Sequence, residues 1–345
     1  MTVQVGSVEP AIDATAVARP TLRGHISIAR PDHWVKNVFV LPGLVVALAL
    51  DPTKTGWNLI LPCILGMISV CLVSSSNYTI NEMLDAPFDR QHPTKCRRPI
   101  PAGRVSIPLG YVQWILLMVV GMALGLMVNL PFAITMGVLW VMGCVYNIPP
   151  LRTKDIPYVD VLSESVNNPL RMLAGWYIVR PDVVVPSSAL LSYWMVGCYF
   201  MAMKRLAEYV EIGDPARAAA YRKSFAFYTR ERLLVSIMFY GSAAMLFFGA
   251  FIMRYRLELV LSFPLVALVM ANYLSLSFKR DSAVQAPEKL YREPTLMASV
   301  IACALVMGVL MLVNLPWVNN VFSPGSAAFE RLAGVDVNGP AEDGP

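Results

Sequence analysis

Residues 77–106 read NYTINEMLDAPFDRQHPTKCRRPIPAGRVS and place eight charged side chains directly after a long apolar run. These are Glu82, Asp85, Asp89, Arg90, Lys95, Arg97, Arg98 and Arg104. Charged groups at a membrane edge are costly unless something offsets them, and Mg²⁺ commonly binds carboxylates together with phosphate oxygens. The pattern therefore indicates a site for a phosphate or diphosphate bridged by a divalent metal.

Composition predicts an all-α polytopic membrane protein. Of the 345 residues, 56% are hydrophobic and 15% are charged, and the mean hydropathy is +0.55. A helix needs about 20 apolar residues to cross about 30 Å of hydrocarbon. Apolar runs near this length predict about nine transmembrane helices, at 34–50, 57–81, 107–128, 131–147, 158–179, 187–207, 232–253, 257–277 and 295–316.

The distribution of basic residues predicts the orientation. With nine spans and a cytoplasmic N-terminus, 22 of the 28 Lys and Arg residues fall in cytoplasmic segments. The opposite loops hold only Lys54, Arg180, Arg254 and Arg256. Because Lys and Arg near span ends favour the cytoplasm, we expect the N-terminus and residues 77–106 to be cytoplasmic and the C-terminus outside. A basic cytoplasmic face does not imply nucleic-acid binding when topology explains it, and we expect an integral protein of a bacterial plasma membrane.

Three regions are expected along the chain. Residues 1–29 are polar and lack a signal-peptide pattern, so they predict a disordered cytoplasmic tail, followed by a membrane domain at 30–318 and a disordered tail at 319–345. The six cysteines form no CxxC or Cys/His cluster, which predicts neither a structural zinc site nor a disulfide framework.

Four oxygen-bearing side chains are predicted to share one helical face. Asn81, Asp85 and Asp89 are spaced by four residues, and Glu82 lies three before Asp85. Hard oxygen ligands of this kind suit Mg²⁺. Pro87 disfavours helix at Ala86 and removes a backbone donor, so Asp89 is expected past a kink. The alternative is a solvated loop whose carboxylates balance the nearby arginines.

Residues 81–103 have the pattern NExxDxxxDRxHPxKxxRPIPAG, which resembles the first acidic motif of the UbiA superfamily of intramembrane prenyltransferases. The usual form is NDxxDxxxD, so Glu82 replaces an Asp. The resemblance implies a helical bundle with a cytoplasm-facing active-site cavity. It also implies a Mg²⁺ cofactor bound by Asn81, Glu82, Asp85, Asp89 and Glu208.

Two further segments resemble elements of this superfamily. Residues 146–154, YNIPPLRTK, resemble its YxxPPxRxK element, in which a basic residue would face phosphate. The alternative is a helix ended by proline with charges reaching the interface. Residues 204–208, KRLAE, lie where the superfamily keeps its second acidic motif, and Glu208 and Glu211 are close enough in sequence to share a metal. A solvated amphipathic helix is the alternative for 211–223.

The fifth predicted span carries a polar face. Asp160, Glu164, Asn167, Asn168 and Arg171 recur every three or four residues. Polar side chains at membrane depth usually face a cavity or one another, which makes this face a candidate for substrate binding. Interhelical hydrogen bonding, or a structural pair between Glu164 and Arg171, is the alternative.

Residues 30–37 (RPDHWVKN), 92–95 (HPTK) and 201–208 (MAMKRLAE) resemble the polyprenyl-phosphate (decaprenyl-phosphate) phosphoribosyltransferases, a branch of the superfamily. This resemblance implies transfer of 5-phosphoribosyl from phosphoribosyl pyrophosphate to a polyprenyl phosphate, with diphosphate as leaving group. The candidate catalytic residues are Asp85, Asp89, Lys154 and Lys204. The candidate substrate-binding residues are Lys36, Asn37, Lys95, Arg98, Tyr146, Arg152, Asp160, Glu164, Asn168 and Arg205.

Two other functions are compatible with the sequence. One is transfer of a prenyl group from prenyl diphosphate to an aromatic or other acceptor. The other is transport or non-catalytic binding of a lipid phosphate. Transporters place their sites near the bilayer midplane, whereas the acidic motif lies at a span end, which favours an enzyme.

Overall fold

The computed structural model describes residues 19–90, 95–279, 282–285 and 287–322, and within these ranges it contains helices and no strand. The α-helices are α1 (Leu22–Ile28), α2 (Leu41–Leu50), α3 (Ile60–Asp89), α4 (Ile107–Val128), α5 (Leu130–Asn147), α6 (Val159–Ser165), α7 (Asn167–Val179), α8 (Ser187–Ile212), α9 (Pro215–Tyr221), α10 (Arg230–Tyr255), α11 (Phe263–Ser277), α12 (Pro294–Leu312) and α13 (Pro316–Phe322). The 3-10 helices used below are η1 (Pro31–Val40), η5 (Thr153–Asp155) and η6 (Lys223–Ala226). The all-α prediction is confirmed.

Seven helical segments of the described chain are long and apolar enough to cross a membrane. They match seven of the nine predicted spans. The other two predicted spans are present as α6 with α7, and as α8. Both carry charged side chains, such as Glu164 and Arg171 in one and Arg205 in the other, which lowers their mean hydropathy. The total of nine crossings therefore stays a prediction.

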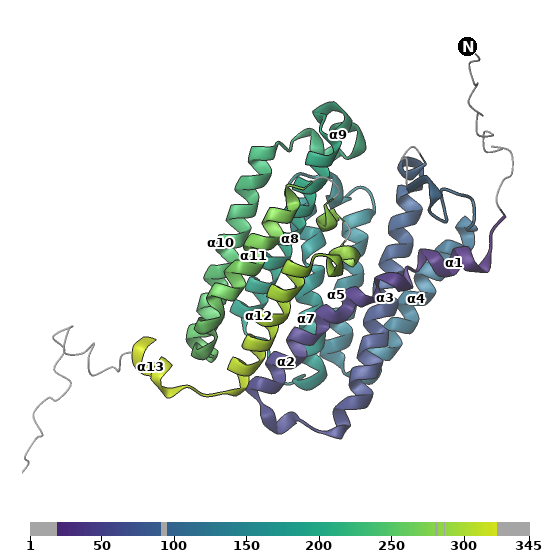
Figure 1. Cartoon of the computed structure of the whole chain (residues 1–345). Helices are drawn as coiled ribbons and strands as arrows, with labels where there is room; N and C mark the ends of the chain where they lie inside the picture. Colours follow the sequence, from purple (N-terminus) through teal and green to yellow (C-terminus); the bar gives the residue numbers. More distant parts are fainter. Residues whose placement is uncertain (1–18, 91–94, 280–281, 286, 323–345) are drawn as a thin grey trace, which may run out of the picture.

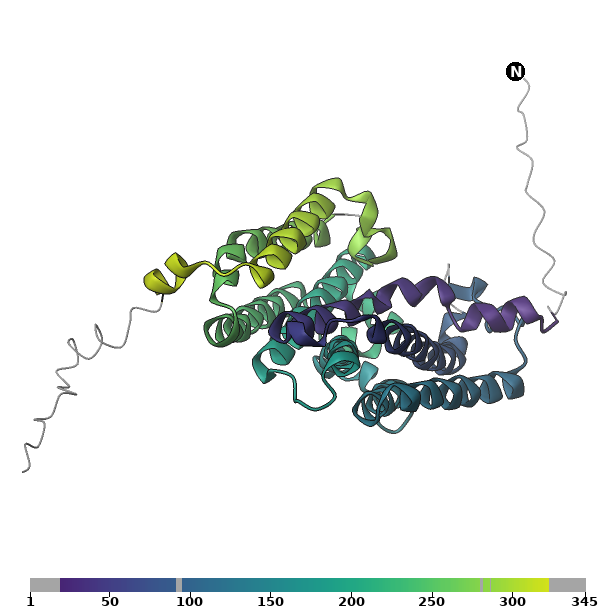
Figure 2. The same ribbon diagram turned by 90° about the horizontal axis from the view of Figure 1, so that it is seen from below.

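Figures 1 and 2 show the long helices packed side by side in one bundle, with α9 beyond one end. Helix α3 packs against α4 and α5, α8 packs against α10, and α2 packs against α7. The α2–α7 contact is close because both helices present glycine. A Cβ at Gly43 would collide with the carbonyl of Met172, and one at Gly175 would collide with the carbonyl of Val40. Small residues allow this backbone approach in membrane bundles.

The carboxylates of the charged motif lie in the last turns of helix α3. Its 30 residues correspond to a length of about 45 Å, which exceeds the hydrocarbon thickness of about 30 Å. The C-terminal turns with Asp85 and Asp89 can therefore extend beyond the apolar layer. Pro87 lies inside α3, which continues to Asp89, and the predicted kink before Asp89 stays a prediction.

The predicted boundaries of the membrane domain need two corrections. Residues 22–28, expected within a disordered tail, form helix α1, in which Thr21 caps the N-terminus and Ile28 is buried with Met83 and Ile100. Residues 319–322, expected in the C-terminal tail, belong to α13. The rest of both predicted tails, 1–18 and 323–345, lies outside the described residues, as do residues 92–94 of the HPTK segment.

Candidate active site

Charged side chains from five parts of the chain meet near the C-terminal end of α3. They come from the last turns of α3, the loop between α5 and α6, helices α6 and α8, and the segment that joins α9 to η6. Helix α5 ends at Asn147, and the following prolines direct the chain across the end of the bundle to η5. This arrangement supports two connected clusters of charges, one around Asp85 and one around Arg205.

In the first cluster, Asp85 is held by two cations. Its Oδ1 accepts hydrogen bonds from Lys154 Nζ at 2.6 Å and from Arg152 Nη2 at 3.0 Å. The Lys154 ammonium also donates to Asn81 Oδ1 at 3.3 Å and to Asn147 Oδ1 at 3.0 Å. Asn81, Asp85, Arg152 and Lys154 were predicted as site residues, and the structure brings them together. Asn147 was not predicted as a site residue.

Lys154 is the most enclosed cation of this first cluster, with 6% of the residue exposed. Burial lowers the pKa of Lys154 below its ordinary value, and the Asp85 carboxylate opposes that shift. The ammonium of a lysine that is almost fully buried is poorly hydrated. It therefore interacts more strongly with an added anion than a surface lysine does.

In the second cluster, Arg205 binds three carboxylates. Its guanidinium donates to Asp160 Oδ2 at 3.2 Å, Glu164 Oε2 at 2.7 Å and Glu208 Oε2 at 2.9 Å. Asp160 is fully buried and also accepts from Tyr228 Oη at 2.6 Å. With its oxygens occupied by protein donors, Asp160 is suited to fix Arg205 and not to contact a substrate.

Tyr146 and Arg222 connect the two clusters. The Tyr146 hydroxyl donates to Glu164 Oε2 at 2.7 Å and lies 3.0 Å from Arg222 Nη2, which donates to it. Arg222 Nη2 also lies 3.2 Å from the carbonyl oxygen of Lys154. The alternative that Glu164 pairs with Arg171 is wrong, because Glu164 pairs with Arg205.

Two predicted metal ligands bind protein cations instead of joining Asp85. Glu82 is buried, lies 3.5 Å from Arg30 Nη2 and accepts from the Ile100 backbone amide at 3.2 Å. Glu208 lies in the second cluster with Arg205. The described residues contain no group of three or more His, Cys, Asp or Glu side chains that could hold a metal. The longer side chain of glutamate explains how Glu82 reaches Arg30 and the loop.

The remaining predicted site residues lie around these clusters. Asp89 accepts from Arg98 Nη1 at 2.6 Å. Lys95 Nζ donates to Tyr221 Oη at 2.7 Å, and Lys36 Nζ lies 3.4 Å from His33 Nδ1. The others are Asn37, buried beside α3, Asn168, packed against Gly197, and Lys204, near enough to act electrostatically on Glu164 and Glu208.

A smaller metal site fits the donor set. The Oδ1 atoms of Asn81 and Asp85 both point at the Lys154 ammonium, so they already converge on a positive charge. Mg²⁺ is usually bound by only one or two carboxylates, with substrate phosphates and water completing its shell. Asn81 and Asp85, with Asp89 one turn further along α3, are suited to hold it in this way.

Three non-glycine residues beside the clusters have a left-handed backbone. They are Arg30 (φ 49°), Arg152 (φ 29°) and Tyr158 (φ 64°). This conformation is costly for residues with a Cβ and tends to occur at functional sites. Arg30 pairs with Glu82, Arg152 pairs with Asp85, and the Tyr158 amide donates to Tyr228 Oη at 2.6 Å. Each of the three strained residues thus takes part in a polar contact within or near the two clusters.

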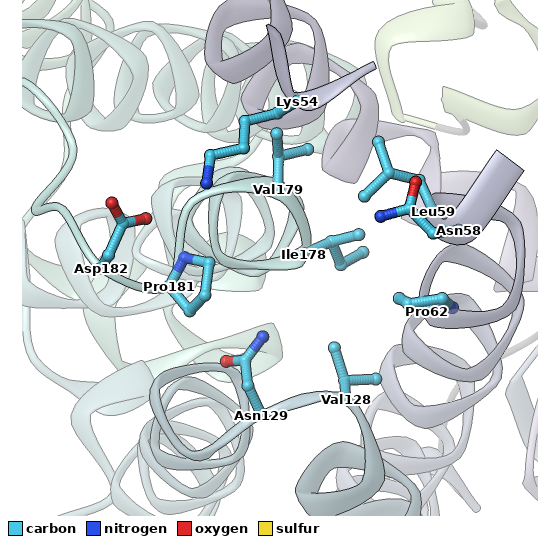
Figure 3. A pocket seen from close by; sticks show the side chains of 10 residues that line it. All are labelled: Lys54, Asn58, Leu59, Pro62, Val128, Asn129, Ile178, Val179, Pro181 and Asp182. Atoms are coloured by element: carbon cyan, nitrogen blue, oxygen red, sulfur yellow. The ribbon is translucent and has the colours of Figure 1, made fainter. Parts of the chain in front are cut away.

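A pocket of about 450 Å³ lies at the opposite end of α3 (Figure 3). Its wall combines apolar side chains, such as Pro62 and Ile178, with the polar side chains of Lys54, Asn129 and Asp182. The polar residues come from the loops that precede α3, join α4 to α5 and follow α7. This pocket is separate from the two clusters, and the predicted cytoplasm-facing active-site cavity stays a prediction.

The bundle and its clusters define a helical membrane protein with a charged site near one end. Over residues 39–301 the sequence matches the UbiA prenyltransferase family. The chain therefore belongs to the UbiA prenyltransferase family and is a transferase of that family.

Individual relatives agree with this assignment. Decaprenyl-phosphate phosphoribosyltransferase of Corynebacterium glutamicum is 31% identical over 224 residues, and the match spans 60% of this chain and 60% of that protein. The enzyme of the same name from Mycobacterium tuberculosis is 30% identical over 226 residues, 66% of this chain and 72% of the relative. A UbiA homologue from Archaeoglobus fulgidus, solved with DMAPP and Mg²⁺, has a TM-score of 0.63 at 21% identity, covering 84% of this chain and 100% of that one. The chain thus has the UbiA fold and resembles the phosphoribosyltransferase branch.

Several residues of the clusters were not predicted as site residues. Arg222 lies in the segment 211–223, for which the sequence also allows a solvated helix, and no motif in the sequence marks Tyr228. Arg30 was noted as part of a motif, without a partner. Helix α8 ends at Ile212, so spacing along the sequence does not place Arg222, and only the path of the chain after α8 brings it to Tyr146.

Proposed function

We propose that this chain is a Mg²⁺-dependent integral-membrane enzyme that transfers 5-phosphoribosyl from phosphoribosyl pyrophosphate to a polyprenyl phosphate. An oxygen of the lipid phosphate attacks the anomeric carbon of the ribose. The bond from that carbon to diphosphate breaks, and diphosphate leaves with the electron pair. No nucleophilic side chain is required.

The observation that carries the proposal is the convergence of Lys154 and Arg152 on Asp85 at the end of α3. Two cations in one partly buried place are suited to stabilise negative charge that develops on a leaving diphosphate. The identity with the two phosphoribosyltransferases supports this donor.

The network gives separate tasks to its members. Asp85 and Asn81 orient Lys154 and are positioned to share a cation with the diphosphate. When bound, Mg²⁺ would neutralise phosphate oxygens as a Lewis acid. Arg222, beside Tyr146 and the Lys154 carbonyl, adds a cation next to the first cluster, while Arg205 fixes the positions of its three carboxylates.

The test uses purified full-length protein in detergent or nanodiscs, with and without Mg²⁺. One reaction contains labelled phosphoribosyl pyrophosphate and a polyprenyl phosphate. The other contains labelled prenyl diphosphate and aromatic acceptors. We expect Mg²⁺-dependent diphosphate release and a labelled lipid product only in the first, and loss of both when EDTA exceeds the metal.

The other outcomes identify the alternatives. A labelled product only in the second reaction would replace the donor by prenyl diphosphate. Absence of a product from both, with retained binding of lipid phosphate, would favour a transporter or lipid-binding protein. Undiminished turnover in excess EDTA would remove the metal from the proposal.

A further inference from the structure

Arg171 of α7 is a buried cation that neither cluster uses. Only 8% of the residue is exposed. Its Nε donates to Asn37 Oδ1 at 3.0 Å, and its Nη2 lies 3.5 Å from Ser74 Oγ. Asn37 in turn donates from Nδ2 to Cys71 Sγ at 3.1 Å. The guanidinium is therefore surrounded by neutral groups from η1 and α3.

No carboxylate of the described chain lies within 4 Å of the Arg171 guanidinium. Arg205, which is also buried, shows the contrast, because three carboxylates bind it. A buried charge that lacks a counter-charge is strongly disfavoured, especially inside a membrane bundle. The two hydrogen bonds use two of the five N–H groups of the guanidinium, which leaves donors for an anion.

The contact of Arg171 with Ser74 places Arg171 relative to Asp85, because both Ser74 and Asp85 belong to α3. Ser74, Asn81 and Asp85 are spaced by seven and four residues, so they lie on one face of α3. Ser74 is about 10 Å further along the axis from Asn81, toward the middle of the bundle. Arg171, which lies against Ser74, is thus deeper in the bundle than Asp85 and Lys154.

We propose that Arg171, with Asn37 and Ser74, binds the phosphate of the lipid acceptor. The inference rests on the proposed function for the identity of that lipid. A phosphomonoester supplies the missing negative charge and accepts several N–H donors at once. Held about two to three turns of α3 from Asn81 and Asp85, toward the middle of the bundle, it faces the donor from the side opposite to the leaving diphosphate, as an in-line substitution requires.

Two of the proposed substrates carry a phosphomonoester: the lipid phosphate, and phosphoribosyl pyrophosphate through its 5-phosphate. The experiment therefore measures three ligands separately: farnesyl phosphate as a soluble lipid phosphate, farnesol as its uncharged counterpart, and phosphoribosyl pyrophosphate. Binding to the purified full chain is measured by calorimetry without turnover. Wild type is expected to bind farnesyl phosphate more tightly than farnesol.

We expect Arg171→Gln to weaken farnesyl phosphate binding by about tenfold or more. Its affinities for farnesol and phosphoribosyl pyrophosphate should stay unchanged. Arg171→Lys, which keeps the charge without the planar fork, should show a smaller loss at an unchanged melting temperature. Arg180→Gln is the matched control, since Arg180 binds Asp51 and Asp182 at the other end of the bundle.

Three results would overturn the inference. One is a preference for phosphate over alcohol that Arg171→Gln leaves intact. Another is a selective loss of phosphoribosyl pyrophosphate binding, which would assign Arg171 to the donor. The third, decisive even if both variants fail to fold, is a wild type that does not distinguish farnesyl phosphate from farnesol. Arg171-dependent binding in a protein that transfers no phosphoribosyl group would retain this inference and remove only the proposed reaction.

Discussion

At the residue scale, Asp85 is the carboxylate on which the first cluster depends. Its Oδ1 binds both Lys154 and Arg152, so its loss frees two cations and removes a candidate metal ligand. We predict that Asp85→Asn lowers Mg²⁺-dependent diphosphate release by at least about 100-fold, the scale of effect seen when a group that stabilises transition-state charge is removed. Initial rates on purified protein measure this effect.

The control for that variant is Asp182→Asn. Asp182 also binds an arginine, Arg180, but at the other end of the bundle. The rate of diphosphate release by the Asp182→Asn variant should stay within about twofold of wild type. Asp182 lies in the loop after α7, at the end of the bundle opposite to the proposed donor site. An Asp85→Asn protein that is folded and fully active would exclude the proposed role of this carboxylate.

Glu82 allows a test between its predicted metal role and its observed contacts. It is buried with Arg30 and the Ile100 amide. We predict that Glu82→Ala lowers the free energy of unfolding by about 1–3 kcal/mol, because it leaves these donors without an acceptor. Thermal melting in detergent measures the loss. A variant that melts like wild type but needs far more Mg²⁺ for activity would restore Glu82 as a metal ligand.

At the element scale, the bundle depends on the close approach of α2 and α7. A Cβ at Gly175 would collide with the Val40 carbonyl, so Gly175→Ala must push the two helices apart. We predict a loss of about 1–3 kcal/mol and a melting temperature lowered by several degrees. Gly249→Ala in α10 is the control, because nothing lies within 4 Å of its added Cβ and alanine favours helix. Equal melting of the two variants would contradict this packing.

The sequence predicted the elements better than their pairings. Spacing on one helix placed Asn81 and Asp85 on the same face, and this was confirmed because four residues make about one turn regardless of tertiary structure. The choice of Arg205 over Arg171 as partner of Glu164 depends on how α8 packs against α6, which spacing within one helix does not encode.

Contacts made by loops, and the direction of long side chains, were also not predictable from the spacing of residues along the sequence. Arg222 reaches Tyr146 across 76 positions of sequence, so no local pattern marks it. The motif identified Glu82 as a carboxylate but not the direction of its longer side chain, which points to Arg30.

At the scale of the whole molecule, the number of crossings decides which side each loop occupies. The loop after α7 lies at the same end as the loop after α2, because Arg180 Nη1 is 2.8 Å from Asp51 Oδ2. This contact favours nine crossings, since α7 and α8 must then both traverse the bundle. If neither crossed the membrane, seven crossings would remain and the later loops would keep their sides.

Residue 184 therefore separates the two counts. Val184 lies between α7 and α8 and is 77% exposed. In a background without the six native cysteines, we predict that a Val184→Cys protein is labelled by an impermeant maleimide added to intact cells. Arg217→Cys on exposed α9 should be labelled only after the cells are opened, because Lys and Arg concentrate on its side. Labelling of both positions only in opened cells would establish seven crossings, with α7 and α8 as a hairpin that enters from the cytoplasm.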